Sequence, residues 1–175
     1  FFVWNKIKKS SVSQEPVNSQ TETETVVDES ISETVKTYAN QDLGFSFDYP
    51  DNFTEEESAE DGEIAINIQG EAGINGLQIV VDPYMEKTEL SLATIKDSAG
   101  ELTIKNENEI LIGQDNKIKA FSFTLNNPPT DNSEVDATDT INEVWFTHDG
   151  KLYQISNYAD FDSYMGKILQ SFRFN

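Results

Sequence analysis

Cysteine is absent from this 175-residue chain, and histidine occurs only once, as His148. Without cysteine the protein has no disulfides, no thiol nucleophile and no cysteine-based zinc site. No Gly-x-Ser-x-Gly sequence presents a serine nucleophile, and the position of His148 beside Asp149 and Gly150 is typical of a solvated residue at a strand end. We therefore predict that the protein is not an enzyme and has neither catalytic residues nor a bound cofactor.

Basic residues are also scarce, since 12 Lys and Arg stand against 32 Asp and Glu and give a net charge of −20. Residues 1 to 36 hold six acidic and four basic side chains. The other 26 acidic and eight basic side chains give residues 37 to 175 a net charge of −18. Affinity for nucleic acid depends largely on Lys and Arg that neutralise phosphates. The composition therefore predicts no nucleic-acid partner.

The first nine residues are apolar and then cationic. Phe1 to Trp4 are followed by Lys6, Lys8 and Lys9, an order typical of the end of a transmembrane helix at the membrane surface. We expect residues 1–9 to be the end of a membrane anchor; the alternative is a short apolar terminus with no membrane role. The three lysines alone favour a cytoplasmic domain, because positive charge is enriched on that side.

Residues 10–37 are rich in Ser, Thr, Glu and Gln and show no apolar periodicity. Such a composition buries too little apolar surface to offset the loss of chain entropy on folding. We interpret this segment as a disordered acidic spacer between the anchor and a domain at 38–175. A short strand or helix over residues 25 to 35 is the alternative.

The domain has the alternation of antiparallel strands. Apolar residues alternate over 64–68, 77–81 and 121–125, and the strands around 141–146 and 152–158 are joined by the Asp149–Gly150 pair, a strong hairpin signal. Two segments change to helical spacing. Leu92, Ile95 and Ala99 predict a helix at about 91 to 100, with Ser91 as N-cap, and a stripe from Phe161 to Phe172 predicts a second helix, with Asp160 or Asp162 as N-cap.

Two acidic clusters stand out in the domain. Glu55, Glu56, Glu57, Glu60, Asp61 and Glu63 make up the first, which we assign to a loop. The second consists of Asp131, Glu134, Asp136 and Asp139. Calcium takes six to eight oxygen ligands from flexible acidic loops, so the second cluster is a tentative calcium site in a chain for which we otherwise predict no metal. A solvated loop that maintains solubility is the alternative.

Four aromatic residues are candidates for a groove that binds a cationic or apolar partner: Tyr84, Trp145, Tyr158 and Tyr164. Aromatic residues at strand and helix spacing are more often part of a core.

Three motifs carry a family resemblance. They are the first strand with Gly44-Phe45-Ser46-Phe47 and Tyr49-Pro50, the late hairpin with Trp145 and the turn at 149–153, and the terminal helix that closes at 168–172. Together they resemble the PsbP-like proteins of the Mog1/PsbP fold over about residues 38 to 175. The chain departs from that pattern at Phe53, where a Trp is frequent.

The resemblance implies an α+β fold with a central, mainly antiparallel sheet flanked by helices, that is, an α/β/α sandwich. It also implies an extracytoplasmic protein, at the cell surface or in the periplasm, that binds membrane assemblies without catalysing a reaction. We therefore expect a membrane-tethered binding or assembly domain whose partner is a membrane or cell-surface protein, and the cytoplasmic orientation stays open. The alternative function is a calcium-associated acidic surface or adhesion domain.

Overall fold

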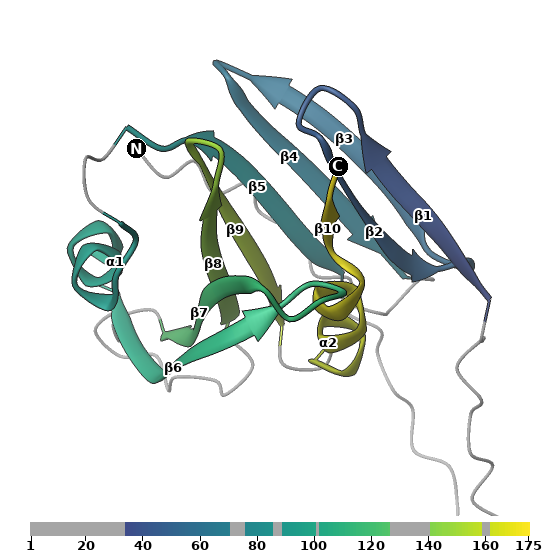
Figure 1. Ribbon diagram of the computed structural model, residues 1–175. Helices are drawn as coiled ribbons and strands as arrows, with labels where there is room; N and C mark the ends of the chain where they lie inside the picture. The colour runs from purple at the N-terminus through teal and green to yellow at the C-terminus, as the bar shows by residue number, and fades with distance from the viewer. Residues whose placement is uncertain (1–33, 71–75, 86–88, 101, 127–140, 159–161) are drawn as a thin grey trace, which may run out of the picture. The chain divides into compact units, whose positions relative to one another are not determined.

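The computed structural model describes residues 34–70, 76–85, 89–100, 102–126, 141–158 and 162–175. In these residues two antiparallel sheets and two helices form the domain (Figure 1). The larger sheet has seven strands in the order β3-β4-β5-β9-β8-β7-β6. They are β3 (Thr54–Glu60), β4 (Glu63–Gln69), β5 (Leu77–Pro83), β6 (Thr103–Ile112), β7 (Ile118–Asn126), β8 (Ile141–His148) and β9 (Lys151–Tyr158).

A second sheet joins the start of the domain to its end. It has the order β1-β2-β10, with β1 (Val35–Asn40) and β10 (Arg173–Phe174) both antiparallel to β2 (Phe45–Pro50). The aromatic strand predicted from the sequence is therefore β2, in the middle of this sheet. β1 begins before the expected domain boundary at residue 38 and pairs with β2 along its whole length.

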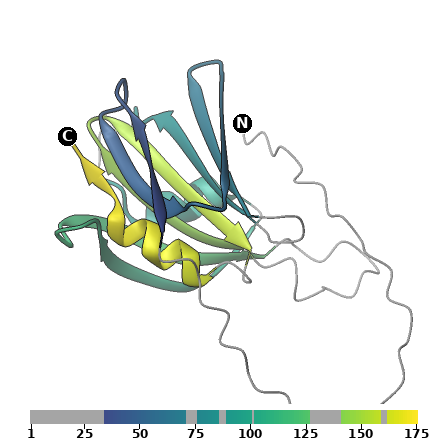
Figure 2. The same cartoon turned by 90° about the vertical axis from the view of Figure 1, so that its right-hand side faces the viewer.

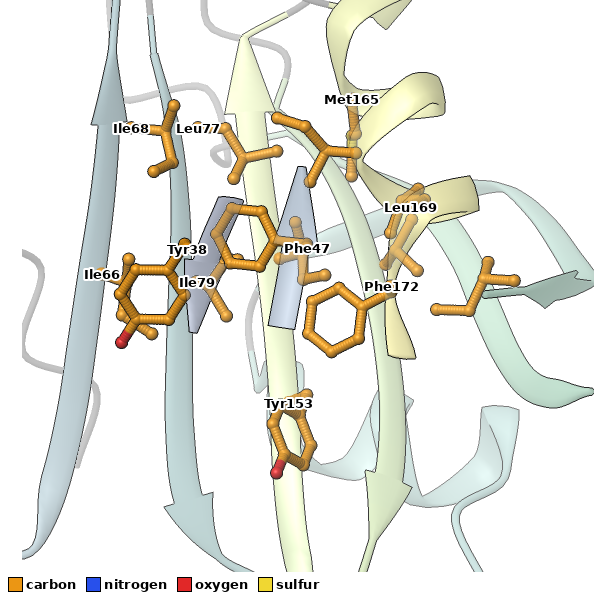
Figure 3. Packing of buried hydrophobic residues seen from close by; sticks show 14 of the residues in the cluster. Tyr38, Phe47, Ile66, Ile68, Leu77, Ile79, Tyr153, Met165, Leu169 and Phe172 are labelled. Atoms are coloured by element: carbon orange, nitrogen blue, oxygen red, sulfur yellow. The ribbon is translucent and has the colours of Figure 1, made fainter. Parts of the chain in front are cut away.

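The main core lies between the two sheets, with α2 (Asp162–Ser171) closing one end of it (Figures 2 and 3). Alternate residues of β2 point into it, and the ring of Phe45 stacks on that of Phe172 with centroids 5.0 Å apart. Met165, Ile168 and Leu169 of α2 are buried in the same cluster. The apolar stripe of the second predicted helix is thereby confirmed.

The other face of the large sheet has a smaller, second core under α1 (Leu92–Ala99). Ile95 of this helix packs with Phe121, Phe123, Leu125 and Trp145. The predicted cap is confirmed, because Ser91 Oγ accepts a hydrogen bond from Thr94 N and the Thr94 side chain accepts one from Ser91 N.

The expected sandwich of helices around one sheet is only partly observed. α1 covers one face of the large sheet, but the opposite face is covered by the three-stranded sheet together with α2. The fold is therefore richer in strands than the expected α/β/α arrangement. The difference arises because the small sheet, through the aromatic residues of β2, packs on a face of the large sheet where a helix was expected.

The assignment of the first acidic cluster to a loop is wrong. Glu55, Glu56 and Glu57 lie on β3, an exposed edge strand paired with β4 from end to end. Two of these carboxylates bind tyrosines of the small sheet: Tyr38 Oη donates to Glu57, and Tyr49 Oη donates to Glu55 Oε2 at 2.6 Å. Burial, followed by the hydrogen bond to Glu55, raises the pKa of Tyr49 to about 12. A charged edge strand also resists pairing with other chains.

Candidate binding cleft between two strands

The large sheet opens between β7 and β8. Their pairing runs from Leu125 and Ile141 to Phe121 and Trp145 and stops there, although β7 begins at Ile118 and β8 continues to His148. Each diverging segment keeps its outer neighbour, because β7 stays paired with β6 and β8 with β9. The edges of β7 before Phe121 and of β8 after Trp145 thus lie within the sheet but are not paired with each other.

The opening arises because the tip of the β6–β7 hairpin bonds to the end of α2 instead of following β8. Gly113 N donates to Leu169 O at 2.9 Å, and Gln114 N donates to Phe172 O at 3.0 Å. Figure 1 shows this tip beside α2 and β10.

A cleft of about 760 Å³ occupies this opening. Next to the last paired residues of the two strands, Ala120 and Phe146 are fully buried, whereas Thr147 and His148, which line the cleft at its mouth, are half-buried. Its apolar lining comes from both cores and from the C-terminal segment. These residues are Leu90, Ile112, Ile118, Phe121, Phe172 and Phe174. The volume lies in the range that holds a drug-sized group or a few amino-acid side chains.

The lining carries an unusual share of the basic residues. It includes three of the chain's 12 Lys and Arg, namely Lys117, Lys119 and Arg173, but only Glu89 and Asp115 of its 32 acidic residues. The wall of the cleft is therefore much richer in basic residues than the rest of this strongly acidic protein. These cations can interact with a carboxylate of a partner over the short distances that remain unscreened in salt.

Each of these cations has an acidic neighbour. Lys117 Nζ lies 2.8 Å from Asp115 Oδ2, and this hydrogen bond lowers the pKa of the Asp115 carboxyl. Lys119 Nζ lies 3.1 Å from Glu109 Oε2 and 5.5 Å from the centroid of the Phe121 ring. Both lysines are more than half exposed, so these pairs contribute little to stability and a ligand carboxylate can compete for them.

Arg173 is held more firmly. Its Nη2 lies 3.1 Å from Asp48 Oδ1 and its Nη1 donates to Ser171 O at 3.0 Å. Burial raises the pKa of Asp48, but the hydrogen bonds from Arg173 and Thr37 outweigh it and leave that pKa lowered. Arg173 thus links the end of the chain to Asp48 on β2, and it also lines the cleft.

His148 lies at the end of β8, as predicted. Its ring stacks on Phe174 with centroids 3.6 Å apart, and its Nε2 lies 3.7 Å from Asp149 Oδ2. The stacking on the C-terminal segment was not predicted, because it depends on a residue 26 positions away in the chain. The imidazole ring of His148 therefore forms part of the cleft wall, beside Phe174.

The predicted aromatic groove is wrong. Trp145 is 2% exposed in the second core, whereas Tyr164 packs against Phe53 beside the main core on the opposite face of the large sheet. Tyr84 is half-buried after β5, and the side chain of Tyr158 is outside the described residues. These aromatics therefore do not form one surface.

The tentative calcium ligands, Asp131, Glu134, Asp136 and Asp139, also lie outside the described residues. Within the parts of the chain that are described, no three His, Asp or Glu side chains come together in a way that could hold a metal ion. The expected anchor at 1–9 and the spacer up to residue 33 are likewise not described. Neither α1 nor α2 is long and apolar enough to cross a membrane, and the described residues contain no other helix.

Sequence reasoning missed the cleft residues Lys117, Lys119 and Arg173. A signal was present, since two lysines flank one isoleucine at 117–119 in a chain so poor in basic residues. Their meeting with Arg173 depends on the tertiary bonds between the hairpin tip and α2, which no local pattern specifies.

Comparison with protein-family models and with curated proteins finds no match. Among solved structures, the chain is similar to cyanobacterial PsbP (CyanoP) from Synechocystis sp. PCC 6803, determined in solution. The TM-score is 0.53 at 15% sequence identity, and the match covers 81% of this chain and 92% of that chain. At this identity the similarity concerns the fold alone. The two-sheet, two-helix domain described above therefore has a PsbP-like fold.

Proposed function

We propose that this chain is a non-enzymatic binding or assembly domain, tethered to a membrane and placed on its extracytoplasmic side, that associates with a membrane or cell-surface protein complex. The observation that carries the proposal is the cleft between β7 and β8, where two open strand edges, six apolar side chains and three basic ones converge. Edges and grooves of this kind bind polypeptide segments. The PsbP-like fold supports the same reading, since the resemblance implies accessory proteins of membrane assemblies.

Catalysis has less support from the described residues. His148 is the single histidine, and its ring stacks on Phe174 and lies beside the Asp149 carboxylate. Glu143, the carboxylate most perturbed by burial, lies in the second core and not in the cleft. The carboxylate most perturbed by burial is thus separated from the cleft.

The proposal is tested on the full chain in its native membrane. After mild detergent extraction, the protein is expected to migrate on a native gel as part of an assembly larger than its own 19.7 kDa. Protease added to intact cells is expected to degrade the domain if it lies outside the membrane. Migration as a free monomer before and after chemical cross-linking would overturn the assembly role, and full protection from protease would overturn the orientation.

A further inference from the structure

We propose that the cleft binds a short extended segment of a partner protein in which carboxylate side chains alternate with apolar ones. This inference rests on the proposed binding function and names the chemistry of the partner. It follows from how the two sheet faces differ at the opening.

The two open strand edges favour a peptide over a small organic anion. A strand edge offers N–H and C=O groups at the spacing of another backbone, and an extended segment laid along it satisfies them as a sheet neighbour. Ile118 and Lys119 on one side and Thr147 and His148 on the other provide such edges at the accessible end of the cleft. A small molecule would use the side chains of the lining but not this backbone.

Side chains of an extended segment point alternately to the two faces of the sheet. On the face of α1, the opening carries Lys119 and Thr147, in line with Phe121 and Trp145 of the second core. On the opposite face it carries Ile118 and His148, with Phe172 and Phe174 beyond them. One face therefore presents a hydroxyl and the ammonium of Lys119, which is paired with Glu109 in an exposed ion pair, and the other face is aromatic.

A segment with glutamate or aspartate at every second position matches both faces at once. Its carboxylates would meet Lys119 and, at the mouth, Lys117, while its apolar side chains would lie on Phe174 and His148. The exposed pairs that hold these lysines are weak enough to exchange partners. The acidic surface of the rest of the domain then restricts such a segment to this one opening, because like charges repel it elsewhere.

The test uses the full chain and a short fluorescent peptide, blocked at both ends, in which glutamate alternates with valine. Fluorescence anisotropy at physiological salt is expected to show saturable binding, and the K117E/K119E variant is expected to weaken it by about tenfold or more. The variant K96E/K105E changes the net charge equally but alters lysines outside the cleft, and it is expected to bind as the wild type does. Circular dichroism confirms that both variants are folded.

Two further peptides separate strand addition from simple charge attraction. A glutamate–valine peptide methylated on alternate backbone nitrogens keeps every charge but loses the N–H donors that would pair with a strand edge. It is therefore expected to bind about tenfold more weakly than the unmethylated peptide. A lysine–valine peptide is expected not to bind. The inference would be overturned if the methylated peptide bound as tightly as the unmethylated one. It would also be overturned if K117E/K119E and K96E/K105E weakened peptide binding to the same extent. If no peptide binds while the chain still migrates in its membrane assembly, this inference fails and the proposed function stands.

Discussion

Trp145 Nε1 donates a hydrogen bond to Glu143 Oε2 at 2.9 Å within β8, on the face of the large sheet that α1 covers. Glu143 is only 6% exposed. Burial raises the pKa of its carboxyl to about 8, against the smaller lowering effect of the Trp145 hydrogen bond. The folded protein therefore keeps this carboxyl largely protonated at neutral pH.

This burial predicts a stability that falls as the pH rises. The folded-state pKa of Glu143 lies above its unfolded value, so between about pH 4.5 and 8 the folded state binds more protons than the unfolded state. The contribution of the group is fully present below the unfolded pKa and is lost as the pH rises through 8. Urea unfolding of E143Q is expected to show a flatter pH profile and a higher stability than the wild type at pH 8, by on the order of several kcal/mol.

The control for this experiment is E56Q, because Glu56 is exposed on β3. It is expected to keep the pH slope of the wild type. Parallel pH profiles for E143Q and the wild type would mean that Glu143 does not carry the effect.

The F172A variant is expected to lose about 3–5 kcal/mol of unfolding free energy. Phe172 is fully buried and packs against Phe45 and Phe47 of β2, so its removal leaves a cavity where the small sheet meets α2. Urea denaturation measures the loss. L111A removes a side chain that is 60% exposed and is expected to change stability by less than about 0.5 kcal/mol; similar losses for the two variants would contradict the packing described here.

The G113A variant tests the contact that opens the sheet. Gly113 has a φ of 86°, and a Cβ there would lie 3.0 Å from Phe172 O and 2.9 Å from Ile118 Cδ1. G62A has a similar φ of 91° but meets nothing within 4 Å, so it measures the backbone strain alone. We expect G113A to unfold at lower urea than G62A, by about 1 kcal/mol or more. Equal midpoints would show that the hairpin tip is not held against α2.

The S171A variant is expected to destabilise the protein by about 1–2 kcal/mol. Ser171 Oγ accepts a hydrogen bond from Asp48 N at 2.8 Å and donates to Ile168 O at 2.8 Å, which joins α2 to β2. S98A removes an exposed hydroxyl that bonds only within α1, and it is expected to be neutral because alanine favours the helix. Thermal melting compares the two variants, and an unchanged melting temperature for S171A would contradict its role.

Local patterns predicted most individual elements. The Asp149–Gly150 pair predicted the β8–β9 hairpin, and both residues have the positive φ that a tight hairpin turn requires. Ser91 predicted the start of α1 because capping depends on residues three positions apart. These elements can be predicted from the sequence because the interactions that form them join residues only a few positions apart.

Prediction failed where the deciding contact is distant. β3 has almost no apolar residues, so its sequence resembles a loop, and it forms a strand because β4 pairs with it and because Tyr38 and Tyr49 reach its carboxylates. Trp145 was a candidate either for a surface groove or for a core, and its burial under α1 decided for the core. In each case the tertiary environment overrides the local preference of the chain.

The sequence alone determined the strand and helix periodicity, the hairpin turns, the strongly acidic charge and the resemblance to PsbP-like proteins, because each depends on residue type and on neighbours close in the chain. Only the tertiary structure decided that β7 leaves β8 at Phe121 and that Arg173 reaches the same opening as Lys117 and Lys119. The physical reason is that the backbone groups of Gly113 and Gln114 bond to the end of α2, more than fifty residues further along the chain.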